Sequence, residues 1–301
     1  MHDTKEKPLP KHEFPERRAM LAGFGAIALW GSLAALSVTA GPVPPFQMVA
    51  MTFAIGAALG IFRARRRGLA WRDLMRWPPR VWLLGVGGLF GYHALYFASL
   101  QLAPPAEANL VNYLWPLLIV LLSAPLAGER LGWTHLAGAM LGFAGVVLLA
   151  FGRGLDFAGG YMLGYALALG CAFTWSLYSV LSRRFGETPT DAIAAFCTAA
   201  SLLSLACHLL FEHTTWPASP AAWLAVLALG IGPTGGAFYL WDHAVKRGDI
   251  RALGAASYAT PILSTGLLIL CGLAQPTSTR LIAALLVTVG AVLASREMWK
   301  R

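Results

Sequence analysis

The sequence predicts an all-α membrane protein in which ten transmembrane helices form two inverted five-helix repeats around a central cavity. Three observations favour this fold class. The chain consists of long hydrophobic stretches with almost no charge, its basic residues lie in alternate loops, and its two halves resemble each other. Of its 301 residues, 57% are hydrophobic and 12% are charged, whereas a water-soluble domain carries about 25% charged residues.

Each hydrophobic stretch has the roughly 17–25 residues that a helix needs to cross a bilayer. The ten predicted spans are 19–40, 45–62, 81–102, 104–125, 131–151, 159–182, 190–211, 220–241, 251–272 and 279–296. Residues 1–18 mix prolines with charges of both signs and lack the basic-then-apolar order of a cleavable signal. We therefore expect them to form a flexible cytoplasmic tail.

The basic residues indicate which way the chain faces. All 23 lysines and arginines except Arg153 and Arg280 lie in the N-terminal tail, in every second loop or at the C-terminal end. Short loops rich in Lys and Arg stay in the cytoplasm. The pattern predicts a multi-pass protein of the cell inner membrane with both termini in the cytoplasm.

The same distribution excludes several classes of protein. The net charge of +9 is spread over juxtamembrane loops, where anionic lipid and topology explain it, so we expect no nucleic-acid partner. The four cysteines lie inside spans without metal-ligand spacing, and neither an HExxH nor a Gly-x-Ser-x-Gly motif is present. The sequence therefore predicts no cofactor, no metal site and no catalytic residue.

The two halves of the chain match when the sequence is shifted by 145 residues. The shift places Trp30 on Trp175, Tyr113 on Tyr258, and Pro116 on Pro261. Because each half, 19–151 and 159–296, holds an odd number of spans, the second copy must cross the membrane in the opposite sense. Inverted repeats of this kind recur in secondary transporters and place the substrate site near mid-membrane, between the halves.

Polar and aromatic side chains at membrane depth mark the candidate site, because polar groups in hydrocarbon need a partner or a wet cavity. In the fourth span they form one helical stripe with spacings of three and four residues. The candidate substrate-binding residues are Tyr92, His93, Tyr96, Asn112, Tyr113, Trp115, Trp175, Tyr178, Tyr239 and Tyr258. We expect His93 and Asn112 to serve a substrate carboxylate and the rings to stack on an aromatic group.

Each assignment has a structural alternative. The deep tryptophans Trp30, Trp115 and Trp175 could pack helices together, and Asn112 could join helices by a hydrogen bond of about 0.6 kcal/mol. Tryptophans near span ends, Trp241 among them, are typical of interfacial anchors. A histidine at this depth is a functional candidate that could instead take part in proton movement.

Three prolines are candidate hinges because proline removes a backbone donor and bends a helix. Pro116 and Pro261 fall near the middle of their spans, and Pro233 lies in the glycine-rich run 230–236. Fixed curvature without motion is the alternative.

These residues also carry a resemblance to a known family. The ten-span plan resembles the drug/metabolite transporter superfamily and its EamA-type exporters, and the stretches 92–100 and 106–117 resemble the YddG-type aromatic amino-acid exporters. The resemblance implies export of aromatic amino acids by alternating access, with Tyr92, His93, Tyr96, Tyr113, Trp115 and Trp175 lining the cavity. The Gly128-Glu129 pair after the fourth span has no acidic counterpart at Leu273 and Ala274, which speaks against a symmetric acidic mechanism.

Other functions stay open at this point. The same carrier could move other small hydrophobic metabolites or drugs, and a channel or a membrane-embedded enzyme is a more distant alternative. The expected partners are the lipid bilayer and a small molecule. A monomer is the simplest assembly, and the sequence leaves the oligomeric state and the driving force open.

Overall fold

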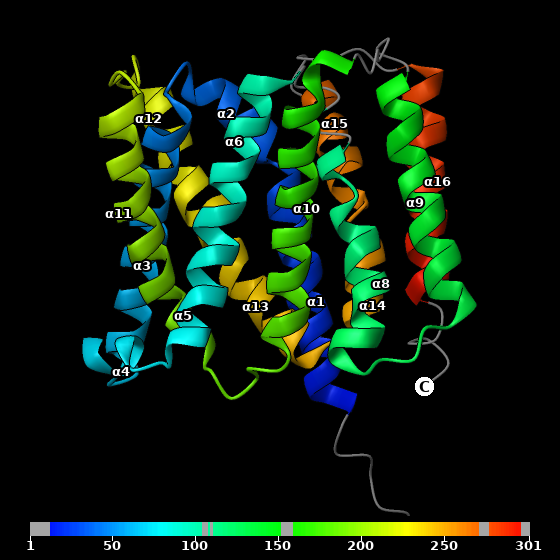
Figure 1. Cartoon of the computed structure of the whole chain (residues 1–301), viewed down its shortest axis with the longest axis horizontal. Helices are drawn as coiled ribbons and strands as arrows, with labels where there is room; N and C mark the ends of the chain where they lie inside the picture. The colour runs from blue at the N-terminus through cyan, green and yellow to red at the C-terminus, as the bar shows by residue number, and fades with distance from the viewer. Residues whose placement is uncertain (1–12, 104–107, 109–110, 152–158, 271–276, 296–301) are drawn as a thin grey trace, which may run out of the picture.

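The computed structural model describes residues 13–103, 108, 111–151, 159–270 and 277–295, and the regular secondary structure of these residues is helical (Figure 1). The first half contains α1 (Glu13–Gly31), α2 (Leu33–Ala40), α3 (Pro45–Arg66), α4 (Trp71–Met75), α5 (Pro79–Val86), η1 (Gly87–Gly91), α6 (Tyr92–Leu102), α8 (Trp115–Ala127) and α9 (Trp133–Phe151). The second half contains η2 (Gly159–Tyr161), α10 (Met162–Ser182), η3 (Thr190–Ala192), α11 (Ile193–Phe211), α12 (Pro220–Ile231), η4 (Gly232–Gly236), α13 (Ala237–Arg247), α14 (Ile250–Ala256), α15 (Ala259–Leu270) and α16 (Ser278–Ser295).

Each predicted span contains helix in the described residues, although α1 begins at Glu13, inside the predicted tail. Among the described residues, five helical segments are long and apolar enough to cross a membrane, and Trp115–Ala127 is a shorter apolar helix. The five segments are Pro45–Arg66, Pro79–Leu102, Met162–Ser182, Thr190–Phe211 and Pro220–Arg247.

Several predicted spans are interrupted rather than continuous. A turn at Ser32 separates α1 from α2, and turns at residues 113–114 and 257–258 precede α8 and α15. Pro116 and Pro261 were expected at mid-span, but each lies in the first turn of the helix that follows the break. Proline is tolerated there because the first N–H groups of a helix have no intrahelical partner.

The internal similarity of the sequence has structural counterparts. The two π-helical turns, η1 and η4, lie 145 residues apart. In Figure 1, α1 runs upward whereas α10, which the same shift places on it, runs downward. The contacts follow the same relation: α3 packs on α11, α9 packs on α16, and the pair α1–α13 corresponds to the pair α10–α6.

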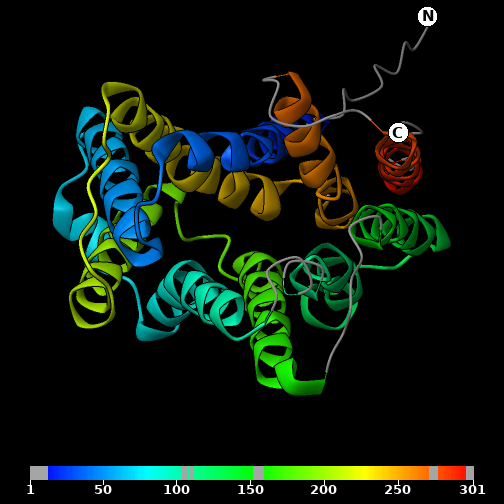
Figure 2. The same cartoon turned by 90° about the horizontal axis from the view of Figure 1, so that it is seen from above.

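Seen from above, α3 and α11 lie at one side of the molecule and α9 and α16 at the opposite side (Figure 2). Two rows of helices connect these sides. One row contains α1, α2, α13 and α15, and the other contains α6, α10 and α8. The candidate residues of the third, fourth and sixth predicted spans thus belong to a single row.

The basic loops gather at one end of the bundle, the lower end in Figure 1. This end carries α4 and the turns that join α8 to α9, α10 to η3, and α13 to α14. The α2–α3 turn and the 212–219 loop lie at the upper end. Several tryptophans expected to be interfacial are well exposed near the helix ends: Trp71, Trp133, Trp216 and Trp223.

Candidate binding site

A cavity of about 490 Å³ lies between the two rows of helices. Its wall includes the exposed residues Ser37, Gly41 and Pro45 at the upper end, so the cavity reaches the surface there. Cavities that hold small molecules have volumes of about 300–1,000 Å³. The described lining residues include no Asp, Glu, Lys or Arg, so the cavity is lined by aromatic, aliphatic and neutral polar groups.

Seven of the predicted binding residues line this cavity. They come from α6, from the turn before α8, from α8 itself and from α10: Tyr92, His93, Tyr96, Asn112, Tyr113, Trp115 and Trp175. From the facing row, the wall includes Trp30 of α1, Pro233 and Thr234 of η4 and Phe238 of α13. The site is thus built by both halves of the chain.

Three tryptophans, Trp30, Trp115 and Trp175, form the inner limit of the cavity, and Trp241 packs against them outside the lining. The ring centroid of Trp30 lies 6.2 Å from that of Trp115, 5.6 Å from that of Trp175 and 5.1 Å from that of Trp241. Edge-on and tilted contacts of this kind contribute about 0.5–1.5 kcal/mol each beyond the burial of area. The indole N–H of Trp30 donates to the carbonyl oxygen of Pro233 at 3.0 Å and fixes the ring against η4.

Trp241, which packs against the tryptophans of the cavity wall, is the residue that sequence reasoning placed wrongly. It was expected to anchor the chain at the membrane interface, but it is fully buried and its indole N–H donates to Ser179 Oγ at 3.0 Å. A signal for it was available, because the shift of 145 residues maps Tyr96 onto Trp241 and His93 onto Phe238. The position of Trp241 at the end of the predicted span 220–241 was given more weight than the repeat, and the resulting expectation of an interfacial anchor was wrong.

Three predicted binding residues lie behind the wall instead of on it. Tyr178 packs under Trp175, with ring centroids 5.2 Å apart. Tyr239 donates its hydroxyl to the carbonyl oxygen of Gly56 at 3.0 Å, and Tyr258 is fully buried beside Phe143 of α9. Their helical faces point toward neighbouring helices, which the residue type alone does not reveal.

The polar groups of the wall are held by specific hydrogen bonds. His93 Nδ1 lies 2.7 Å from the carbonyl oxygen of Leu89, which belongs to the π turn η1. The side-chain N–H of Asn112 donates to the hydroxyl of Tyr92 at 3.1 Å. The rings of Tyr92 and Tyr96 stack with an angle of 9° between their planes. The arrangement offers aromatic faces and a few neutral polar atoms to a ligand.

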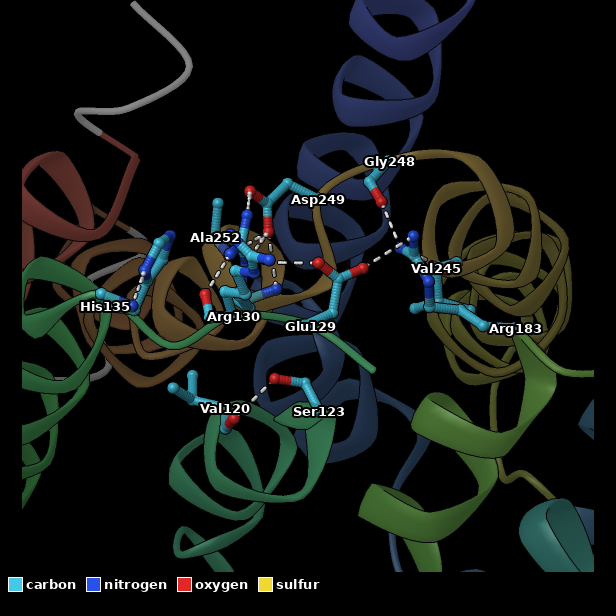
Figure 3. A network of polar contacts seen from close by, with 12 residues as sticks. Val120, Ser123, Glu129, Arg130, His135, Arg183, Val245, Gly248, Asp249 and Ala252 are labelled. Atoms are coloured by element: carbon cyan, nitrogen blue, oxygen red, sulfur yellow. Dashed lines mark hydrogen bonds and ion pairs between the residues drawn. The ribbon is translucent and has the colours of Figure 1, made fainter. Parts of the chain in front are cut away.

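At the basic end, four charged residues form a group of ion pairs that we call the closing network: Glu129, Arg183, Asp249 and Arg251 (Figure 3). Glu129 Oε1 lies 2.9 Å from an Arg183 nitrogen and Oε2 lies 3.9 Å from Arg251 Nε. The Arg251 guanidinium also contacts the carbonyl oxygen of Arg130. These contacts join the first half of the chain to the second.

The carboxylate of Asp249 stays ionised within this network. Burial alone would raise the pKa of Asp249, but hydrogen bonds from Arg251, its charge and the backbone N–H of Ala252 outweigh burial, and the pKa is lowered. Arg251 is therefore held in place by one acidic group of its own half and reaches Glu129 of the other half.

The sequence profile of the EamA-like transporter family matches residues 17–151 and again residues 162–296. The chain belongs to the EamA-like transporter family. This EamA-family protein is therefore a multi-pass membrane transporter and not an enzyme.

Its relatives include proteins with a named activity. It is 53% identical over 279 residues to the aromatic amino acid exporter YddG of Ancylobacter novellus, covering 92% of this chain and 96% of that protein. It is 27% identical over 271 residues to the aromatic amino acid exporter YddG of Salmonella typhimurium, covering 83% and 87%. A crystal structure of a protein with 52% sequence identity matches with a TM-score of 0.90 over 95% of this chain and 99% of that chain.

Proposed function

We propose that this chain exports aromatic amino acids across the cell inner membrane. The observation that carries the proposal is an uncharged cavity whose inner limit is built from the rings of Trp30, Trp115 and Trp175. Such faces stack on an indole, phenol or phenyl ring and attract an ammonium group by cation–π interaction. The named activity of the relatives favours the same cargo.

The proposed topology has ten spans in two inverted repeats, 19–151 and 159–296, with both termini in the cytoplasm. The opposite courses of α1 and α10, the spacing of η1 and η4, and the gathering of basic loops at one end support it. On this topology the basic end is cytoplasmic and the cavity opens outward. The site lies within one chain, so a monomer suffices.

Transport then requires alternating access, in which the closing network separates while the upper end shuts. Pro116, Pro233 and Pro261 are the proposed hinges, because each lies in or directly after an irregular turn next to the cavity. Turns that already lack regular α-helical hydrogen bonding can bend at a lower cost than a continuous helix.

Purified protein in liposomes tests this function by uptake of labelled tryptophan, with phenylalanine, tyrosine, aliphatic amino acids and hydrophobic drugs as competitors. We expect the aromatic amino acids to compete best. Preferential competition by drugs or unrelated metabolites would favour the alternative cargo. Parallel measurements with and without a pH gradient report the driving force.

The cavity assignment is tested by Trp115→Ala. We expect an uptake rate about tenfold lower, because Trp115 contributes several aromatic contacts to the inner limit. Trp133→Ala is the matched control, since Trp133 is 71% exposed and far from the wall. An unchanged rate in Trp115→Ala would contradict the assignment.

A further inference from the structure

His93 presents only one of its two ring nitrogens to a ligand. Its Nδ1 lies 2.7 Å from the carbonyl oxygen of Leu89. A carbonyl oxygen can only accept a hydrogen bond, so Nδ1 must carry the hydrogen. The ring is held on other sides by aromatic side chains, with centroids 5.2 Å away for both Phe53 and Tyr92. Nε2 is therefore the nitrogen available toward the cavity.

The neutral form of the ring fits these surroundings. None of the described residues that line the cavity is Asp or Glu, so no carboxylate of the wall pairs with an imidazolium. An unpaired charge at this depth is costly. In neutral histidine with a hydrogen on Nδ1, Nε2 is a hydrogen-bond acceptor.

Asn112 also offers an acceptor. One of its two side-chain N–H hydrogens is donated to the hydroxyl of Tyr92, whereas its Oδ1 has no hydrogen-bond partner among the described residues. The asparagine is 4% exposed and lines the cavity. A buried oxygen without a partner is costly, so a ligand donor that reaches it would be stabilised.

We infer that His93 Nε2 and Asn112 Oδ1 accept hydrogen bonds from the α-ammonium of the transported amino acid, an inference that rests on the proposed function. The faces of Tyr92 and Tyr96 add cation–π attraction for the same group. This assignment reverses the sequence-based expectation that His93 and Asn112 serve the carboxylate, because the Nδ1 hydrogen of His93 is already donated to Leu89 and the Asn112 oxygen lacks a partner among the described residues.

Competition experiments separate the two ends of the substrate. Tryptamine has the ammonium without the carboxylate, and indole-3-propionate has the carboxylate without the ammonium. His93→Phe keeps an aromatic ring and removes the acceptor. We expect it to raise the half-inhibitory concentration of tryptamine against labelled tryptophan about tenfold, the effect of losing one hydrogen bond to a charged group. Inhibition by indole-3-propionate should change less than about twofold.

An equal loss of inhibition by tryptamine and by indole-3-propionate would show a packing role for His93 and overturn the inference. If inhibition by indole-3-propionate falls more than inhibition by tryptamine, His93 binds the carboxylate, as the sequence led us to expect. Asn112→Asp provides an independent variant: added negative charge should strengthen inhibition by tryptamine and weaken inhibition by indole-3-propionate, and the opposite change would contradict the assignment.

Binding measurements keep this inference separate from the proposed function. If the wild-type protein moves no tryptophan, the proposed function fails, but tryptamine binding to the detergent-solubilised wild type, His93→Phe and Asn112→Asp still compares the acceptors directly. Wild-type affinity for tryptamine equal to that of His93→Phe would refute the role of His93 in either case.

Discussion

The two ends of the bundle are related by the internal repeat but differ in charge. At the basic end, the closing network joins the halves through Glu129, Arg183 and Arg251. The residues 145 positions away from the four members of the network are all uncharged: Ala274, Val38, Pro104 and Ala106. Among the described residues, the ion pairs that join the two halves lie at the basic end. The two transport states that we propose would therefore be stabilised by different physical interactions.

The α3–α11 pair behaves differently, because equivalent positions are joined at both of its ends. At the basic end Arg67 pairs with Asp191 at 3.0 Å. At the upper end Glu212 accepts hydrogen bonds from the backbone N–H groups of Phe46 and Gln47 at 2.9 and 3.1 Å. The repeat relates Arg67 to Glu212 and Phe46 to Asp191.

In the transport cycle that we propose, the α3–α11 pair is a frame, because its contacts at both ends would hold α3 against α11 whichever end of the cavity is open. The closing network would be a gate, because it joins the halves at one end and can hold only one state. On the proposed mechanism, damage to the frame should lower stability without changing which end is open. Damage to the closing network should change which end is open without lowering stability.

Glu212→Gln is expected to have the largest effect. The carboxylate is nearly buried and accepts two backbone N–H groups, and it also contacts His208 Nδ1 at 2.9 Å. Loss of charge-assisted hydrogen bonds should lower the free energy of unfolding by about 2 kcal/mol, which the thermal midpoint of the solubilised protein measures. Glu187→Gln, at an exposed loop position, is the matched control. A Glu212→Gln variant with wild-type stability but altered access to the cavity would contradict the distinction between frame and gate.

Glu129→Gln is expected to have a smaller effect of a different kind. The network side chains Glu129 and Arg183 are 22% and 26% exposed, so their pairing contributes at most about 1 kcal/mol. The variant should raise labelling of a Ser179→Cys reporter from the basic side by about two- to fivefold, because Ser179 lies under Trp241. Native cysteines are replaced beforehand, and Glu187→Gln in the same background serves as control. Unchanged labelling would show that the closing network does not control access to the cavity from the basic end.

Ionic strength gives the smallest expected effect. Raising salt from about 0.1 M to 1 M shortens the screening length from about 10 Å to 3 Å, which weakens partly exposed ion pairs. Labelling of Ser179→Cys should rise by less than about twofold in the wild-type background and stay constant in Glu129→Gln. An equal rise in labelling with salt in both backgrounds would show that the salt acts on ion pairs other than those of Glu129.

The sequence predicted an all-helical chain, because hydrophobic length acts locally along the chain, but it did not predict the breaks at Ser32, 113–114 and 257–258. It also predicted seven residues that line the cavity, from α6, from residues 112–113 before α8, from α8 and from α10. It placed Tyr178, Tyr239 and Tyr258 on the wall because residue type does not reveal which neighbour a helical face meets. The repeat does identify one lining residue that was not predicted, since it maps Trp115 onto Thr260.

The polarity of His93 could not be predicted from the sequence for a related reason. It depends on a hydrogen bond to the carbonyl of Leu89, four residues earlier, and a regular helix would use that carbonyl for its own backbone. The closing network also needed the structure, because Glu129, Arg183 and Arg251 are far apart in sequence.

The contact between Trp30 and Trp241, with ring centroids 5.1 Å apart, makes the protein its own optical reporter. Indole rings this close share electronic excitation, and their coupling depends steeply on separation and relative angle. Any rearrangement that moves α1 relative to α13 should therefore change the aromatic circular dichroism of the unlabelled protein, and an arriving indole substrate should add a further chromophore to the same coupled set.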